Sequence, residues 1–154
     1  MRLVVAVVGK ARNVALGEAI RDYEARAARY WPLDVHEVRD ERAGGLPVEK
    51  VKEREGVRLS DKIPERAQKI ACEVGGKSLS SAQFAEFLQT AREQDRDLAF
   101  LIGGAFGLAS DVTSGANMRL SLAPWTLPHE IARLVLVEQI YRAGTIVRGE
   151  PYNK

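Results

Sequence analysis

The sequence predicts an α/β fold with a mainly parallel sheet, and three observations support this prediction. Short apolar segments alternate with longer helical patterns along the chain, as in strand–helix–strand units. Two of these segments, RLVVAVVG at residues 2–9 and DLAFLI at 97–102, are apolar on both faces, which is typical of strands covered by helices on either side. No linker, repeat or low-complexity tract divides the 154 residues, so we expect residues 1–154 to form a single domain.

The first half of the chain predicts two strands and two helices. A β-branched run predicts the strand at 2–9, and apolar residues at helical spacing predict an amphipathic helix at 16–30, which a proline ends. LDVHEV at 33–38 indicates a second, more solvated strand. Two glycines and a proline at 44–47 mark a loop, and a charged pattern predicts a helix at 47–62.

The middle of the chain predicts a strand, a turn and a helix. An apolar run favours a third strand within residues 67–74, and the glycine pair after it predicts a turn at GGKS, residues 75–78. Ser80 then stands three residues before Gln83, the spacing of a capping box, so a helix is expected to begin there.

The last third predicts two more strands and a long helix. Residues 97–102 form a doubly buried strand and GGAFG at 103–107 a tight loop. SDVTSGAN at 110–117 indicates a short helix or turn, and MRLSLA at 118–123 a last short strand. The pattern at 129–147 is apolar over more than one stripe, which predicts a helix buried on two sides, one of them available to a partner chain.

Composition narrows the possible functions. With 23 basic and 21 acidic side chains the formal charge is +2, so charge by itself predicts no nucleic-acid partner. The longest apolar run near the start is too short to cross a bilayer, no secretory signal pattern is evident, and the lone Cys72 excludes an internal disulfide. We therefore expect a cytoplasmic protein without a membrane span.

Two histidines and one cysteine, without clustered carboxylates, predict no metal site.

Three segments that follow predicted strands are candidates for ligand binding, because ligands bind at the carboxyl ends of such strands: GGKS, GGAFG and APWTLPH. GGKS resembles a phosphate-binding loop, but Ala71 stands where the first glycine belongs, which leaves nucleotide hydrolysis as a minor alternative. Gly103 and Gly104 indicate either a sharp turn or a backbone that approaches a ligand closely. The position of His129 directly after Pro128 predicts a residue at the start of a helix and, by itself, no further role.

Three pieces of the chain resemble one known family when taken together: LIGGAFGL, LSLAPWTLPHEIARLVLVEQIYRA and the terminal EPYNK. In this order and spacing they are similar to the ribosomal RNA large subunit methyltransferase H family, of the SPOUT class of knotted methyltransferases. The resemblance implies an α/β knot fold with a carboxyl-terminal trefoil knot. It also implies that a homodimer transfers a methyl group from S-adenosylmethionine to N3 of a pseudouridine in 23S rRNA, on the assembled ribosome.

The resemblance also implies roles for particular residues. The family positions that contact the cofactor correspond to Cys72, Glu73, Gly103, Gly104, Ala123, Pro124, Trp125, Thr126, Leu127 and Pro128. Positions near the methyl group and the target base correspond to His129 and Tyr152. By its chemistry a cation, either Lys154 or Arg142, would favour the N3 anion, and the sequence places neither.

The chain departs from the family pattern at three places. Ala105 and Phe106 stand where the family usually has Pro and Glu, which removes a carboxylate from the rim of the loop. Asn153 stands where His is common, and Lys154 lies near a position where Arg is common. Loss of that imidazole leaves the proton acceptor unassigned. If the protein is not an enzyme, the alternative function is that of a non-catalytic ribosome- or RNA-binding relative with the same fold.

Overall fold

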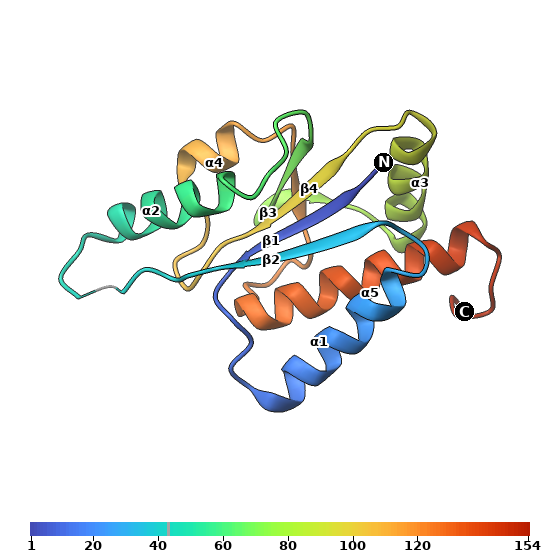
Figure 1. Ribbon diagram of the computed structural model, residues 1–154, viewed down its shortest axis with the longest axis horizontal. Helices are drawn as coiled ribbons and strands as arrows, with labels where there is room; N and C mark the ends of the chain where they lie inside the picture. The colour runs from blue at the N-terminus through green and yellow to red at the C-terminus, as the bar shows by residue number, and fades with distance from the viewer. Residues whose placement is uncertain (43) are drawn as a thin grey trace.

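The computed structural model describes residues 1–42 and 44–154, which form a five-stranded sheet with helices on both faces (Figure 1). The strands are β1 (Leu3–Val8), β2 (Leu33–Val38), β3 (Gln68–Ser78), β4 (Leu98–Ile102) and β5 (Met118–Ser121). The helices are α1 (Val14–Ala27), α2 (Val48–Ser60), α3 (Ser81–Glu93), α4 (Ser110–Ser114) and α5 (His129–Val147).

The sheet is parallel, with the strand order β2-β1-β4-β3-β5. Every residue of β1 and β4 is buried, which confirms that these two apolar segments are covered on both faces. The central position of β1 and β4 follows from their composition, because only strands with apolar side chains on both faces avoid burying polar groups there.

Alternate residues of the central strands β1 and β4 pack against two different layers of helices, one on each face of the sheet. Val5 and Phe100 pack in the core cluster that includes residues of α1, α3 and α5, whereas Ala6 and Leu101 pack with Leu59 of α2. This alternation follows from the two-residue period of a strand. Figure 1 shows the resulting arrangement, with α2 and α4 on one face and α1, α3 and α5 on the other.

Trp31, just after α1, joins that end of α1 to the interior of α5. Its side chain is 1% exposed, and Nε1 donates a hydrogen bond of 3.0 Å to the carbonyl oxygen of Ile140. The guanidinium of Arg92 lies 3.7 Å from the centre of the indole ring, in cation–π geometry. A buried indole with a satisfied N–H fixes the distance between the two helices.

Most of the predicted boundaries agree with the structure to within a few residues. Ser80 accepts from the backbone of Gln83, and the Gln83 side chain accepts from the Ser80 N–H, so the predicted capping box is confirmed. The predicted start of the last helix at His129 is also confirmed. Within the described residues 1–42 and 44–154, no helix is long and apolar enough to span a membrane.

The predicted turn at GGKS is wrong, because β3 continues through these residues to Ser78. Its pairing with β5 shifts register between Cys72 and Lys77, so the residues between them form a bulge, and Lys77 and Ser78 pair with β5 again. A Cβ at Gly76 would stand 2.6 Å from the carbonyl carbon of Leu120. Gly76 therefore serves the close approach of β5, and GGKS does not form a phosphate-binding turn.

Gly144 allows α5 to pack against the end of α1, and its replacement should destabilise the fold. A Cβ there would stand 2.5 Å from the Cβ of Tyr30 and 2.7 Å from its Cδ1. We expect Gly144→Ala to lower the free energy of unfolding by about 1–2 kcal/mol, because the clash outweighs the gain in helix propensity. Urea unfolding at a fixed protein concentration measures this change.

The matched control is Gly17→Ala in α1, where the new Cβ would meet only the mobile end of Arg21 at 3.3 Å and the Ala11 Cβ at 3.6 Å. This variant should be unchanged or stabilised by up to about 1 kcal/mol. Equal stability of the two variants would contradict the proposed role of Gly144.

Candidate functional site

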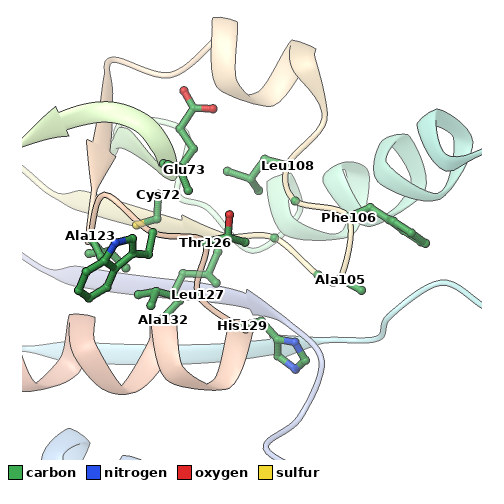
Figure 2. A pocket seen from close by; sticks show the side chains of 17 residues that line it. Cys72, Glu73, Ala105, Phe106, Leu108, Ala123, Thr126, Leu127, His129 and Ala132 are labelled. Carbon is green, nitrogen blue, oxygen red and sulfur yellow. The ribbon is translucent and has the colours of Figure 1, made fainter.

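A pocket of about 390 Å³ lies at the carboxyl ends of β4 and β5, beside residues 72–74 inside β3 (Figure 2). The parallel sheet brings these three distant segments together, because the loops that leave β4 and β5 lie at the same edge of the sheet, next to the irregular part of β3. The pocket is lined by Cys72, Glu73, Val74, Ile102, Gly103, Gly104, Ala105, Phe106, Gly107, Leu108, Leu122, Ala123, Trp125, Thr126, Leu127, His129 and Ala132.

The loop at residues 103–107 turns tightly at the end of β4. The N–H of Gly107 donates to the carbonyl oxygen of Gly104 at 3.0 Å, and Gly107 has a φ of +83°, which glycine adopts without strain. A Cβ at Gly103 would stand 2.5 Å from the carbonyl carbon of Gly107. Gly103 is therefore required by the close approach of the loop's own backbone.

A Cβ added at Gly104 would point toward other protein atoms and not into the pocket. That Cβ would lie 2.8 Å from Oε2 of Glu55 and 3.0 Å from Cγ1 of Val8. The sequence left a sharp turn and a close approach to a ligand as the two interpretations of the glycine pair, and the structure gives a different reason, since neither glycine has a positive φ and both positions are required by packing against protein atoms. The reading in which a Cβ would collide with a ligand has no support from the direction of this Cβ.

The segment at residues 122–128 forms another wall of the pocket. Its start is held by a hydrogen bond of 2.8 Å from Oγ of Ser121 to the carbonyl oxygen of Ala123. Figure 2 shows Leu127 between Cys72 and Ala132, while Trp125 is 76% exposed. Two prolines restrict the backbone of this segment, which explains how it keeps an irregular path before α5.

Cys72 and Glu73 are the residues through which β3 lines the pocket. Burial raises the pKa of the Cys72 thiol to about 12, so the thiol is protonated at neutral pH and is a poor nucleophile. The carboxylate of Glu73 forms an ion pair with Arg119 of β5, with 3.1 Å between Oε1 and Nη1. Cys72 therefore contributes a neutral surface to the pocket, and Glu73 a paired charge.

His129 lies at the edge of the pocket, as the first residue of α5. Its imidazole stands over Gly9, where a Cβ would be 3.2 Å from Nε2. Gly9 has a φ of +86° and ends β1. Because Gly9 has no side chain, the imidazole of His129 fits between the turn after β1 and the pocket.

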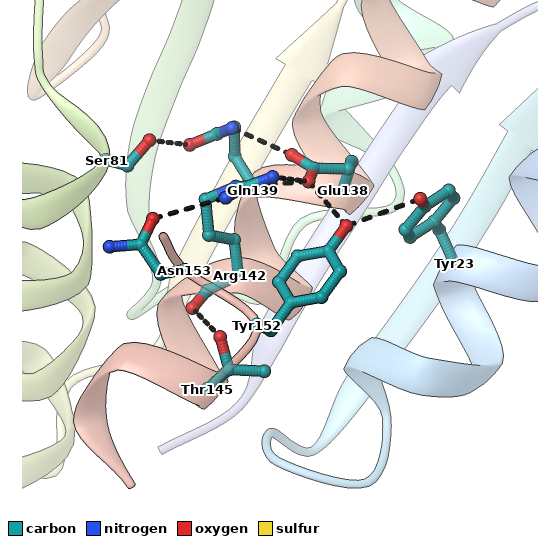
Figure 3. A network of polar contacts seen from close by, with 8 residues as sticks. All are labelled: Tyr23, Ser81, Glu138, Gln139, Arg142, Thr145, Tyr152 and Asn153. Carbon is teal, nitrogen blue, oxygen red and sulfur yellow. Dashed lines mark hydrogen bonds and ion pairs between the residues drawn. The ribbon is translucent and has the colours of Figure 1, made fainter. Parts of the chain in front are cut away.

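Tyr152 and the carboxyl-terminal tail lie elsewhere on the same chain (Figure 3). The Tyr152 hydroxyl donates to Oε1 of Glu138 at 3.0 Å and lies 3.4 Å from the hydroxyl of Tyr23. Burial, together with these two hydrogen bonds, raises the pKa of Tyr152, so this phenol stays neutral. Glu138 lies nine residues after His129, which is roughly 14 Å along the axis of α5.

Arg142 links the tail to the same network. Its Nε donates to Oε1 of Glu138 at 3.1 Å, and its Nη1 donates to Oδ1 of Asn153 at 3.2 Å. The guanidinium also lies 4.7 Å from the centre of the Tyr152 ring. Asn153, at one of the departures from the family pattern, thus helps to hold the tail on α5, whereas Lys154 is exposed.

The structure therefore brings most of the expected site residues together within one chain. All the residues expected to contact the cofactor line the pocket except Pro124 and Pro128, and His129 lines it as well. Tyr152 and Lys154 do not lie in this pocket. Sequence reasoning missed Ala132, although it follows His129 at the i+3 spacing that places two residues on the same helix face.

Comparisons with known proteins show the family to which the chain belongs. The family model described as "Predicted SPOUT methyltransferase" matches residues 1–153. A ribosomal RNA large subunit methyltransferase H from Gemmatimonas aurantiaca is 56% identical over 154 residues, with all of both chains covered. Proteins of the same name are 42% identical in Bacillus cytotoxicus, with 100% of each chain covered, and 40% identical in Syntrophotalea carbinolica, with 99% of each covered.

Solved structures show the same fold at low sequence identity. A probable methylase family protein from Haemophilus influenzae has a TM-score of 0.55 and 11% identity, over 99% of this chain and 70% of that one. A putative methylase family protein from Neisseria gonorrhoeae has a TM-score of 0.52 and 13% identity, over 91% and 80%. The chain therefore belongs to the SPOUT methyltransferase family, as a member of its ribosomal RNA large subunit methyltransferase H group.

Proposed function

We propose that this protein transfers a methyl group from S-adenosylmethionine to N3 of a pseudouridine in 23S rRNA, on the assembled ribosome and as a homodimer. Family membership supports the class of reaction, since the names of its relatives describe methyltransferases of large-subunit ribosomal RNA. One observation carries the proposal furthest: three segments that are far apart in the chain and expected to contact the cofactor line a single pocket.

The pocket fits the chemistry of this cofactor. Its volume of about 390 Å³ lies in the range typical of small-ligand sites. Leu127 and Ala132 offer apolar contact to a purine ring, and the backbone of residues 103–107 offers N–H and C=O groups to its polar edges. We therefore assign the cofactor to the 103–107 loop and the 122–127 segment. When bound, S-adenosylmethionine supplies a methyl group activated by its sulfonium.

The chain's own residues then have to position the base and manage one proton, because N3–H of a pseudouridine is a weak acid. The protonated Cys72 thiol makes no covalent bond to the base. The raised pKa keeps the Tyr152 phenol protonated, so we assign it the role of a neutral hydrogen-bond donor, whose O–H would exchange Glu138 for the target base, and not that of the proton acceptor. His129, at the pocket edge, lies nearest to the place where we expect the reacting atoms.

The proposed homodimer gives the carboxyl-terminal tail a place at the site. Tyr152 and Lys154 do not line the pocket of their own chain, and Tyr152 is anchored at Glu138, roughly 14 Å along α5 from His129. Several apolar residues of α5, among them Leu134 and Val135, remain only half-buried in the single chain. We propose that α5 packs against a second copy, so that the tail of one subunit completes the site of the other.

Methyl incorporation tests the proposed function. Labelled S-adenosylmethionine is supplied with matched samples of naked 23S rRNA, isolated large subunits and intact ribosomes. We expect intact ribosomes to be labelled at least about 10-fold faster than naked rRNA, because a formal charge of +2 provides few phosphate contacts for free RNA. Nuclease digestion and mass spectrometry should then find the methyl group on a pseudouridine.

Three other outcomes would overturn parts of the proposal. Equal labelling of naked rRNA and ribosomes contradicts the requirement for an assembled target. A methyl group on another nucleoside contradicts the assignment of the substrate. Tight ribosome binding without methyl transfer would favour the non-catalytic relative instead.

A further inference from the structure

Glu55 is a buried carboxylate without a role in the proposed reaction. It lies on α2, and only 3% of its surface is exposed. Its Oε2 accepts the backbone N–H of Glu41 at 3.3 Å, whereas Oε1 has no hydrogen-bond partner among residues 1–42 and 44–154. Arg58, on the same helix, pairs with the carboxylate of Glu41. One oxygen of Glu55 therefore remains free to accept a hydrogen bond.

The carboxylate of Glu55 lies directly against the 103–107 loop. A Cβ at Gly104 would stand 2.8 Å from Oε2 and 3.1 Å from Oε1. The carboxylate thus occupies the space that a side chain of residue 104 would need, and it packs directly against the backbone of Gly104. Because Gly104 also lines the pocket, Glu55 forms the support behind the pocket wall.

The position of α2 leaves the carboxylate little freedom. A Cβ at Gly56 would stand 2.9 Å from Cγ2 of Val112, so the missing side chain of Gly56 allows α2 and α4 to lie close together. Val51 and Leu59, four residues before and after Glu55 on the same face of α2, are buried in the core. Glu55 therefore meets the loop from a fixed helix.

A role in packing alone does not explain an acid at this position. Burial raises the pKa of Glu55, and the nearby carboxylates of Asp40 and Glu41 raise it further, while the Glu41 N–H and Arg58 act in the opposite direction. An apolar side chain of similar length would fill the same space without the cost of removing a carboxylate from water. The oxygens themselves must therefore matter.

We propose that Glu55 is a positioning residue for the cofactor, whose carboxylate accepts from the backbone of Glu41 and packs against Gly104, so that α2 supports the 103–107 loop from behind. This inference rests on the proposed function, because it assumes that the pocket binds S-adenosylmethionine. Glu55 does not touch the reacting atoms. It holds the loop in the conformation that receives the cofactor, which predicts an effect on cofactor affinity rather than on the rate once the cofactor is bound.

Two variants of similar shape separate the oxygens from the packing. Glu55→Met removes both oxygens and fills the space, and Glu55→Gln keeps one accepting oxygen at nearly the same place. The exposed Glu49→Gln on the same helix is the control. Calorimetry with S-adenosylmethionine should show affinity at least about 10-fold weaker for Glu55→Met and within about threefold of wild type for both glutamine variants.

Two further measurements distinguish positioning from a general loss of structure. In the cofactor-free protein, amide hydrogen exchange of residues 103–107 should be faster in Glu55→Met than in wild type, while exchange of β2 is unchanged. At saturating cofactor, the methyl-transfer rate of Glu55→Met should fall by less than about threefold. Glu55→Leu is measured in the same way if the methionine variant does not fold.

The inference is overturned if Glu55→Met binds the cofactor as well as wild type does. It is also overturned if Glu55→Gln loses as much affinity as Glu55→Met, because the amide keeps an accepting oxygen. Failure of the proposed function gives a different result, since the wild-type protein would then not bind S-adenosylmethionine at all.

Discussion

Removal of Tyr152, Asn153 and Lys154 is expected to lower methyl transfer to ribosomes by at least about 100-fold and to leave cofactor affinity within about threefold of wild type. The tail lies apart from the pocket of its own chain, so its loss should not disturb that pocket. Under the proposed function it supplies the neutral donor Tyr152 and the cation Lys154 to the target base. Initial rates with intact ribosomes and calorimetry with S-adenosylmethionine measure the two effects.

Tyr152→Phe is the matched control for this truncation. It keeps the ring, whose centre lies 4.7 Å from the centre of the Tyr141 ring, and removes only the hydroxyl that binds Glu138. We expect this variant to lose less activity than the truncated protein, because Lys154 remains. If the truncated protein methylates ribosomes at the wild-type rate, the tail has no part in the reaction.

Gly103→Ala should abolish measurable cofactor binding, with an affinity at least about 100-fold weaker than that of wild type. The new Cβ would stand 2.5 Å from the carbonyl carbon of Gly107 and 2.7 Å from the backbone N of Leu108. Backbone atoms cannot move aside as the end of a flexible side chain can, so the loop must change its path. We expect the midpoint of thermal unfolding to fall as well.

Gly75→Ala provides the comparison, since a Cβ there has no other atom within 4 Å and the position does not line the pocket. Its cofactor affinity and unfolding midpoint should match those of wild type. Calorimetry on the two variants side by side decides the matter. Wild-type affinity in Gly103→Ala would show that the 103–107 loop does not form the cofactor site.

Much of the fold could be predicted because its strongest signals are local. The apolar runs of β1 and β4 need burial on both faces, and the Ser80 cap marks the start of α3 through hydrogen bonds within four residues. The meeting of the 103–107 loop and the 122–128 segment at the pocket also followed, since parallel strands place their carboxyl ends at one edge. The predicted GGKS loop does not take part, because β3 continues through it and lines the pocket with residues 72–74 instead.

The remaining features depend on contacts that no local pattern encodes. Gly76 looks like part of a turn in the sequence, and only the approach of β5 explains why it lies in a strand. Glu55 looks like one more charge on a solvated helix, and only the placement of α2 over Gly104 reveals that it is buried. The trefoil knot and the participation of a second subunit stay predictions, carried by the resemblance.

The opposite surroundings of the two tryptophans give the protein a built-in optical probe. Trp31 is sealed between α1 and α5, whereas Trp125 is 76% exposed at the pocket. An ionic quencher such as iodide can collide with the second indole and not with the first. The quenchable part of the fluorescence therefore comes from one wall of the pocket, and its decrease on titration with a ligand reports occupancy without any label.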